Sequence, residues 1–466
     1  MTVAEATPDL EHIDHNDRAF IGHPKGLGYL GFAEGCERFS YYSMQTLLTL
    51  YMVNYLLVPG RMDHVIGLNW VQAHLYGGIS GQPLGSAIFG TYTSVVYLTP
   101  IFGGIVADKW LGRNLTLIIG GVLMALGHFL MAIESAFIFA LLALMFGVGA
   151  FKGNIATQVG ALYGPNDLRR AMAFQIFYIF INVSVIAAPL VSGTLGQKVG
   201  WDYGFACAGV VMVAGLIIYL SGRRYLPPER PIRRRDGAAV RDPLTRDDWL
   251  RVLYLVILIP VLAITLLTNQ EIFNAYLVWG DQQFDLTLLN HTSSWLITVD
   301  ATVSFTMLVA VAAFWKWWGA RHREPDEISK MIIGGVFTVA AGLALYMAAL
   351  TQPAGGKISL VWPLVFELMA SIGFAHILPV SLALFSKISP RQITATVIGL
   401  YYLSFFLANA MVGYIGGLYS SLPTTTFWLI HVASAAFGLV AFVVFKLVLG
   451  KRLAGTGAAE QARALG

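Results

Sequence analysis

Long apolar stretches follow one another along almost the whole chain, and they decide what it can fold into. A helix needs roughly 20 apolar residues to span about 30 Å of hydrocarbon. Only 12% of the residues are charged, whereas soluble domains typically contain about 25%. The sequence therefore predicts an all-α integral membrane protein with twelve transmembrane helices. The predicted spans are 26–58, 84–107, 114–133, 136–160, 170–196, 202–222, 250–280, 293–316, 328–350, 360–386, 392–419 and 424–449.

The basic residues predict the orientation of the chain. Cytoplasmic flanks of membrane helices collect Lys and Arg. With both termini in the cytoplasm, all but five of the 30 Lys and Arg residues fall on cytoplasmic segments or at the cytoplasmic ends of spans. We therefore expect a multi-pass protein of the inner (plasma) membrane with both termini cytoplasmic. The five exceptions are Arg61, Lys198 and Lys357 in outer loops, and Arg38 and Lys152 within spans.

One polar interruption divides the predicted spans into two groups of six. Residues 223–249 contain a run of arginines and several prolines, and they lack an apolar period. We interpret this segment as a cytoplasmic linker; a regulatory segment that binds anionic lipid is the alternative. The expected units are a cytoplasmic tail, a six-helix bundle, the linker, a second six-helix bundle and a cytoplasmic tail, at 1–25, 26–222, 223–249, 250–450 and 451–466.

No sequence pattern points to a metal, a cofactor or catalysis. Cys36 and Cys207 lie in predicted helices, and there is no metal-type Cys/His spacing. The motifs HExxH and GxSxG and the phosphate loop do not occur in the sequence. We therefore expect a protein that is not an enzyme and that needs no cofactor.

Four ionisable residues within predicted spans are the most informative, because charges in the hydrocarbon region are costly and usually functional. Glu34, Glu37 and Arg38 lie on one helical face at i, i+3 and i+4. Lys152, deep in the fourth span, is the natural group to balance the surplus negative charge. One interpretation is a cluster that only pins two helices together. The functional interpretation is a cluster whose net charge changes when Glu34 or Glu37 takes up a proton.

Four segments resemble known transporter motifs. The loop from Gly103 to Arg113 (GGIVADKWLGR) resembles the signature after helix 2 of the major facilitator superfamily, or MFS. Residues 34–42 (EGCERFSYY) resemble the ExxERFxYY signature of the proton-dependent oligopeptide transporter (POT) family. Residues 149–155 (GAFKGNI) resemble the lysine motif of that family, and 177–184 (FYIFINVS) resemble its FYxxINxGS motif.

The resemblance implies an MFS fold of two pseudo-symmetric halves, with the substrate site between them near the membrane midplane. It implies symport of di- and tripeptides with protons, by a chain that we expect to be a monomer in membrane lipid, without a nucleic-acid partner. Arg38 would bind the peptide carboxylate with its planar fork, and Lys152 would alternate between substrate and the glutamates. Glu34 and Glu37 would carry protons. The other substrate-binding residues that the resemblance implies are Tyr41, Tyr42, Tyr92 and Asn182.

The second half departs from the pattern of the family. Where helix 7 of the family carries Glu-Gln, this chain has Asn269-Gln270 followed by Glu271. That shift turns the side chain by about 100° unless the helix is locally broken. The usual glutamate of helix 10 is replaced by Phe374, whereas Asp300 is gained in helix 8. We expect Asp300 first, and then Glu271, to couple protons, and Asp300 also to hold the ammonium group of the substrate.

Other acids in the second half are weaker candidates. Glu367 lies two turns before Phe374. Asp281, Asp285 and His64 lie near predicted outer ends. They could form an extracellular gate, but we interpret them as solvated loop residues. Because the ammonium side of the expected site is altered, an MFS transporter of another small amphoteric solute stays open as an alternative to a peptide symporter.

Overall fold

The computed structural model describes residues 17–164, 167–227, 244–390 and 392–464. Within these residues the chain is helical, and its extended pairing is limited to two isolated β-bridges. Eleven helices in this part of the chain are long and apolar enough to span a membrane. The expectation of an all-α membrane protein is therefore confirmed.

Helix α1 (Lys25–Tyr51) completes the set of twelve spanning helices. It carries Glu34, Glu37 and Arg38 close together, so its composition alone does not mark it as a span. It packs against α6 (Arg169–Ala188) and α8 (Trp201–Ser221), and nearly all of its residues are buried. Three charges are tolerated at this depth because neighbouring helices, and not lipid, surround them.

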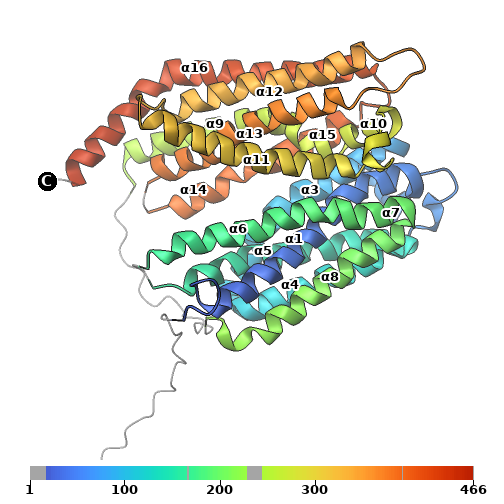
Figure 1. Cartoon of the computed structure of the whole chain (residues 1–466), viewed down its shortest axis with the longest axis horizontal. Helices are drawn as coiled ribbons and strands as arrows, with labels where there is room; N and C mark the ends of the chain where they lie inside the picture. Colours follow the sequence, from blue (N-terminus) through green and yellow to red (C-terminus); the bar gives the residue numbers. More distant parts are fainter. Residues whose placement is uncertain (1–16, 165–166, 228–243, 391, 465–466) are drawn as a thin grey trace, which may run out of the picture.

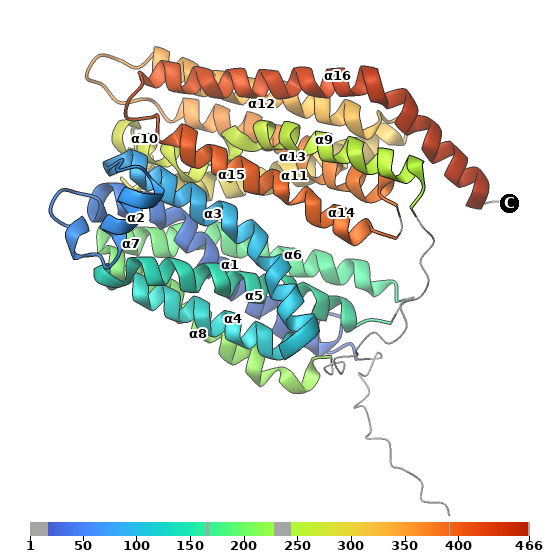
Figure 2. The ribbon, with the colours of Figure 1, turned by 180° about the vertical axis from the view of Figure 1, so that it is seen from behind.

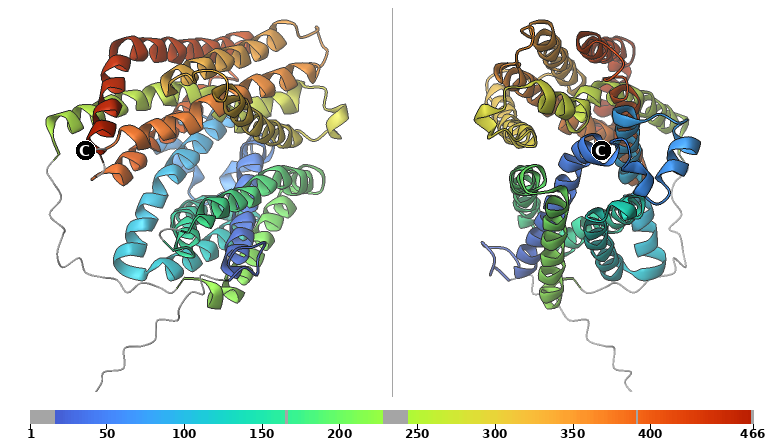
Figure 3. Two further views of the ribbon diagram at one scale, coloured as in Figure 1. Left: turned by 60° about the vertical axis from the view of Figure 1, so that its left-hand side comes forward. Right: turned by 90° about the vertical axis from the view of Figure 1, so that its right-hand side faces the viewer.

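The spanning helices form two groups, which lie one above the other in Figures 1 and 2. The right-hand panel of Figure 3 looks along the helices and separates the blue-to-green group from the yellow-to-red group. The first group consists of α1, α3 (Gly81–Val106), α4 (Arg113–Met131), α5 (Phe137–Ala161), α6 with its continuation α7 (Thr194–Lys198), and α8. The second consists of α9 (Arg246–Gln270), α10 (Ala275–Gln283), α11 (Trp295–Gly319), α12 (Glu327–Leu350), α13 (Val361–Ile388), α14 (Thr394–Tyr401), α15 (Leu403–Gly416) and α16 (Thr424–Ala464).

The boundaries of the predicted units stay a prediction. Residues 1–16 of the expected N-terminal tail and 228–243 of the expected linker lie outside the described residues. Helix α16 continues through residue 450, where the second bundle was expected to end, as far as Ala464. The short helix α2 (Leu68–Leu75), in the loop before α3, was not predicted.

The two groups are joined at the end of the molecule that carries α7 and α10, on the right in Figure 1. In the described part of the chain, the hydrogen bonds between the two halves cluster there. We call three of these contacts the α7–α10 closure. Its pairs are Asn54–Asp281 at 3.0 Å, Gln197–Ser293 at 2.6 Å and Trp295–Thr194 at 2.8 Å.

Asp281 is a central acceptor of this closure. Asn54 Nδ2 donates to its Oδ2 at 3.0 Å, and Ser293 Oγ donates to its Oδ1 at 2.7 Å. The interpretation of Asp281 as a solvated loop residue is therefore wrong, because the fold brings α1 and the segment before α11 against it. Asp285 is exposed and accepts a hydrogen bond from Thr287 of its own loop.

Gly90 of α3 and Gly413 of α15 allow the two halves to touch backbone to backbone. A Cβ atom at Gly90 would lie 2.3 Å from Gly413 Cα and 2.6 Å from Gly413 N. We expect Gly90→Ala to destabilise this conformation by about 1–3 kcal/mol, because the backbone of α15 would have to move. Gly104→Ala is the matched control, since a Cβ atom at Gly104 of the same helix meets nothing within 4 Å. Melting temperatures in detergent measure the difference, and equal melting temperatures for the two variants would contradict it.

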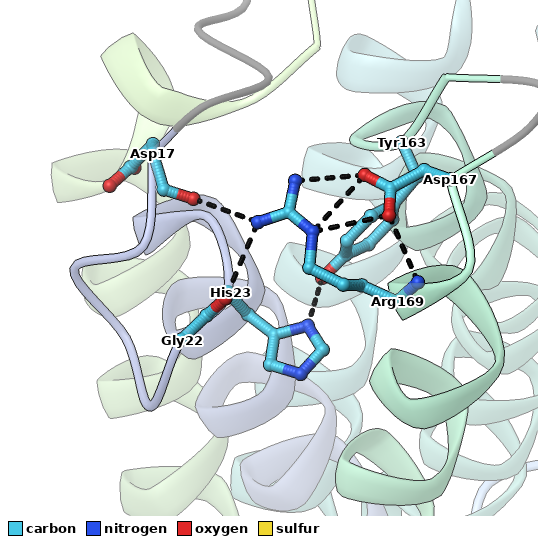
Figure 4. Close-up of polar contacts among 6 residues, drawn as sticks. All are labelled: Asp17, Gly22, His23, Tyr163, Asp167 and Arg169. Atoms are coloured by element: carbon cyan, nitrogen blue, oxygen red, sulfur yellow. Dashed lines mark hydrogen bonds and ion pairs between the residues drawn. The ribbon is translucent and has the colours of Figure 1, made fainter.

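The residues before α1 are fixed to the loop between α5 and α6 and to the first residue of α6. Arg169 donates to the backbone oxygens of Asp17 and Gly22, at 3.3 Å each, and His23 Nδ1 is 2.9 Å from Tyr163 Oη. The Asp17 carboxylate also accepts the backbone N–H of Lys25, the first of α1, at 2.7 Å. We call residues 17–24 the strap. Figure 4 shows the cluster of Asp17, Gly22, His23, Tyr163, Asp167 and Arg169.

We expect the strap to loosen on acidification. Burial lowers the pKa of His23, and so does the charge of Arg169, whereas Asp167 raises it to a lesser extent. A histidine whose pKa is lower in the folded state stabilises that state when neutral, so this contribution is lost as the pH falls below about 6.5. Hydrogen exchange of residues 17–24 above and below that pH measures the change. His23→Asn should abolish the pH dependence, and exchange that is equally pH-dependent in His23→Asn would refute this origin.

Candidate functional site

The charged residues of α1 form one compact ion cluster. Arg38 Nε lies 2.6 Å from Glu34 Oε1 and 3.1 Å from Glu37 Oε2. The exposed fractions of the Arg38, Glu34 and Glu37 side chains are 8%, 2% and 0%. Their helical spacing therefore brings them together as the sequence predicts. One guanidinium group faces two carboxyl groups.

Lys152 of α5 lies beside this cluster but contacts aromatic rings. Its Nζ is 5.6 Å from the centroid of the Tyr41 ring and 5.2 Å from that of the Tyr97 ring. In the part of the chain that the structure describes, Lys152 forms no ion pair within 4.0 Å. Glu37 and Glu34 interact with it electrostatically over a longer distance. In this conformation Lys152 thus contacts the faces of two aromatic rings, whereas Arg38 forms the ion pairs with Glu34 and Glu37.

Tyr97 was missed by the sequence analysis. It lies on α3, and its ring stacks on that of Phe405 from α15, with the centroids 4.9 Å apart. The ring that contacts Lys152 therefore also contacts the second half. The only signal in the sequence was a second tyrosine in the same span, five residues after Tyr92.

The other residues implied by the resemblance lie in two environments. Tyr41 and Tyr92 are buried in the apolar core of the first group, whereas Tyr42 and Asn182 are half-buried. The Tyr42 ring lies 6.5 Å, between centroids, from that of Phe273 in the second half. Asn182 Nδ2 donates to a backbone oxygen of its own helix at 2.8 Å. Tyr42 and Asn182 are therefore the two whose side chains are accessible.

Asp300 of α11 lies against a second acid, Glu367 of α13. The two carboxyl groups are close enough to interact electrostatically, and the hydroxyl oxygens of Ser304 on α11 and Ser371 on α13 are 2.9 Å apart. Tyr276 of α10 donates to Glu367 Oε1 at 2.9 Å, and Ser304 donates to Asp300 Oδ1 at 3.4 Å. The acid that the sequence ranked as weaker is thus the immediate partner of Asp300. Its position two turns before Phe374 gave no hint of this, because the contact depends on how α11 and α13 pack.

Glu271 lies at a local break between α9 and α10. Helix α9 ends at Gln270, a 3₁₀ turn covers Glu271–Phe273, and Asn274 has φ −120° and ψ −110° before α10 begins. Glu271 Oε1 accepts the backbone N–H of Ala275 at 3.1 Å. Its Oε2 lies 3.5 Å from His431 Nε2 of α16, and both side chains are fully buried. The sequence analysis did not single out His431, because nothing near it in the chain suggests a partner.

The two halves contribute different charged groups. The first half contributes the cations Arg38 and Lys152 beside Glu34 and Glu37, and the second contributes the carboxyl groups of Asp300 and Glu367. Tyr42 lies between the two sets, since it interacts electrostatically with Arg38 and with Asp300. An arrangement with cations on one side and acids on the other suits a solute that carries both a carboxylate and an ammonium group.

Comparison with known proteins assigns the family. The model of the Major Facilitator Superfamily matches residues 31–412 of the chain. The chain belongs to the major facilitator superfamily. This membership confirms the expected MFS fold and the identity of a membrane transporter. The loop signature at Gly103–Arg113 lies within the matched region.

Peptide transporters of the POT family are prominent among the similar proteins, in agreement with the resemblance of the sequence motifs. A di-/tripeptide transporter of Lactococcus lactis subsp. cremoris is 26% identical, over 94% of this chain and 99% of its own length. The peptide transporter YePEPT of Yersinia enterocolitica is 27% identical, over 86% and 89%.

Two solved structures show the same fold. The peptide transporter POT in complex with sulfate matches with a TM-score of 0.79 and 23% identity, over 93% of this chain and 96% of that chain. A POT family transporter in complex with 5-aminolevulinic acid matches with a TM-score of 0.76 and 19% identity, over 94% and 98%.

Proposed function

We propose that this MFS transporter is a proton-coupled symporter that imports di- and tripeptides by alternating access. The observation that carries the proposal is the presence of the cations Arg38 and Lys152 in the first half and of the acids Asp300 and Glu367 in the second. A peptide backbone is an amphoteric solute whose two charged ends fit these two sets. The printed names of the relatives, which are peptide and di-/tripeptide transporters, support the same substrate class.

The proposed roles follow the contacts. Arg38 binds the carboxylate of the peptide, and Lys152 moves between its aromatic contacts and the substrate. Glu37 and its neighbour Glu34 carry the proton of the first half. We place the proton on Glu37 first, because neither oxygen of Glu37 receives a hydrogen bond in the described structure. Asp300 binds the ammonium group. The accessible side chains that shape the remaining surface are Tyr42, Tyr97 and Asn182, and the roles proposed for Tyr41 and Tyr92 need a conformation that exposes them.

The described conformation corresponds to one stage of the transport cycle. With both termini cytoplasmic, as the basic residues predict, the α7–α10 closure faces the outside of an inner membrane. The site is then closed to the outside in this conformation. Uptake of a proton by Glu37 weakens the ion pair between Glu37 and Arg38. Arg38 then becomes available for the carboxylate of the next peptide. Glu271 is proposed as a second coupling residue because it lies where α9 breaks.

Uptake into proteoliposomes tests the proposal. Radiolabelled di-alanine is supplied outside, with an acid-outside gradient, and a protonophore serves as the control. Gradient-driven uptake that the protonophore abolishes is the expected result. Equal uptake with and without the gradient would contradict proton coupling.

The alternative substrate class is a small amphoteric solute that is not a peptide. It is favoured by Phe374, which occupies the position of a usual acid of the family, and by the 5-aminolevulinic acid bound to a neighbour of the same fold. Competition separates the two classes. Inhibition of di-alanine uptake by excess tri-alanine, but weakly by 5-aminolevulinic acid, indicates a peptide transporter. The reverse order, or no di-alanine uptake by folded protein, indicates the other class.

A further inference from the structure

His431 of α16 presents both of its ring nitrogens to hydrogen-bond acceptors. Its Nδ1 lies 3.0 Å from the backbone oxygen of Phe427, and its Nε2 lies 3.5 Å from Oε2 of Glu271. A carbonyl oxygen only accepts hydrogen bonds, so Nδ1 carries a hydrogen. A neutral imidazole ring has a single N–H, and its Nε2 would then turn a lone pair toward the carboxylate. The geometry therefore requires one further proton, either on Nε2 or on the carboxyl group of Glu271.

His376 of α13 shows how a neutral ring is accommodated in the same protein. Its Nδ1 also lies against a backbone oxygen of its own helix, that of Ile372, at 2.8 Å. Its Nε2, however, accepts the indole N–H of Trp315 at 3.1 Å. One ring hydrogen thus satisfies both nitrogens of His376. At His431 a carboxyl group takes the place of the indole donor, and the two histidines therefore differ in their need for a proton.

The pair of Glu271 and His431 is enclosed. Both side chains are 0% exposed, and neither His431 Nε2 nor Glu271 Oε2 has another hydrogen-bond partner among the described residues. The rings of Phe427 and Trp428 flank His431, with centroids 4.8 and 5.0 Å from its own. Two buried acceptors that face each other are costly, and one proton between them removes this cost. With that proton the pair is neutral in sum, which suits its burial.

Glu271 connects this pair to the start of α10. Its Oε1 accepts the backbone N–H of Ala275, the first residue of α10, at 3.1 Å, while its Oε2 faces α16. Helix α10 also carries Asp281, whose Oδ2 accepts the hydrogen bond from Asn54 in the α7–α10 closure. A carboxyl group held by His431 therefore fixes the beginning of a helix on which this end of the molecule closes.

We infer that Glu271 and His431 hold one proton between them, and that His431 is the positioning residue that fixes the start of α10 to α16 through this proton. The inference goes beyond the proposed function and does not depend on it, because neither a substrate nor transport enters the argument. For the proposed symport, it adds His431 as the partner of the second coupling residue.

Spectroscopy of the purified full chain detects the proton without any substrate. With nitrogen-15 in the histidines, magnetic resonance distinguishes protonated from unprotonated ring nitrogens, and infrared spectroscopy detects the C=O band of a protonated carboxyl group. The difference between wild type and His431→Gln should contain either two protonated ring nitrogens, or one unprotonated nitrogen together with a carboxyl band that Glu271→Gln also lacks. An unprotonated nitrogen without a carboxyl band would overturn the shared proton. That second pattern is expected for the matched control, His376→Gln.

Hydrogen exchange tests the positioning role. Glu271→Gln keeps an acceptor for the N–H of Ala275 and replaces the shared proton by an amide N–H that donates to a neutral His431, so amides at the start of α10 should exchange as in wild type. His431→Leu leaves the carboxyl group without its partner, and the same amides should exchange faster by roughly tenfold. Wild-type exchange in His431→Leu would overturn the positioning role. If melting curves show that His431→Leu is not folded, the double variant Glu271→Gln, His431→Leu is compared with Glu271→Gln, and the same two outcomes decide.

Discussion

Arg38→Ala is expected to abolish peptide uptake and to lower stability by about 3–5 kcal/mol, the range found when one partner of a buried ion pair is removed. Arg38 is the only cation within 4.0 Å of Glu34 and Glu37 in the described residues. Its removal leaves two buried carboxylates without a partner, and they must take up protons or stay unpaired. Uptake into proteoliposomes and denaturant unfolding in detergent measure the two effects.

Two further variants separate stability from transport. Arg38→Lys retains the charge but lacks the planar fork that binds a carboxylate through two donors. We expect it to recover most of the lost stability and little of the uptake. The triple variant Arg38→Ala, Glu34→Gln, Glu37→Gln removes the unpaired charges and should be more stable than Arg38→Ala alone. Wild-type stability of Arg38→Ala would show that the cluster is not an ion pair in the membrane.

Lys152→Gln is expected to remove gradient-driven uptake while the protein stays folded. The contacts of Lys152 in this conformation are with the rings of Tyr41 and Tyr97. Such contacts contribute about 0.5–2 kcal/mol, so the loss of stability should stay within that range. Transport should suffer much more, because no other lysine in the described spans lies near the Arg38 cluster.

The measurement for Lys152 compares three assays. Gradient-driven uptake should be lost, exchange of labelled for unlabelled peptide without a gradient should be less affected, and the melting temperature should change little. Lys198→Gln, at an exposed position, is the control and should behave as wild type in all three. Gradient-driven uptake by Lys152→Gln at the wild-type rate would remove Lys152 from the coupling mechanism.

The sequence was most informative about features that depend on a single helix. The positions of the spans follow from hydropathy, and the cluster of Glu34, Glu37 and Arg38 follows from the spacing of residues on α1. The MFS family and the resemblance to peptide transporters were likewise carried by continuous motifs. These features need no knowledge of how helices pack.

The contacts between helices were not predictable in the same way. Glu367 meets Asp300 because α11 packs against α13, and His431 meets Glu271 because α16 packs near the end of α9. The break after Gln270 is marked by neither glycine nor proline, so no local signal announced it. Lys152 contacts aromatic rings in this conformation because Arg38 already forms ion pairs with both Glu34 and Glu37.

The α7–α10 closure is expected to depend little on ionic strength. Its contacts are made by hydroxyl, amide and indole donors, and Asp281 is the charged member among the pairs described. Salt screens the attraction between opposite charges, with a Debye length of about 8 Å at physiological ionic strength, but it has little effect on hydrogen bonds to neutral donors. A closure of this kind keeps nearly the same strength in dilute and in concentrated salt. Opening of this end of the molecule is therefore expected to respond little to the concentration of salt around it.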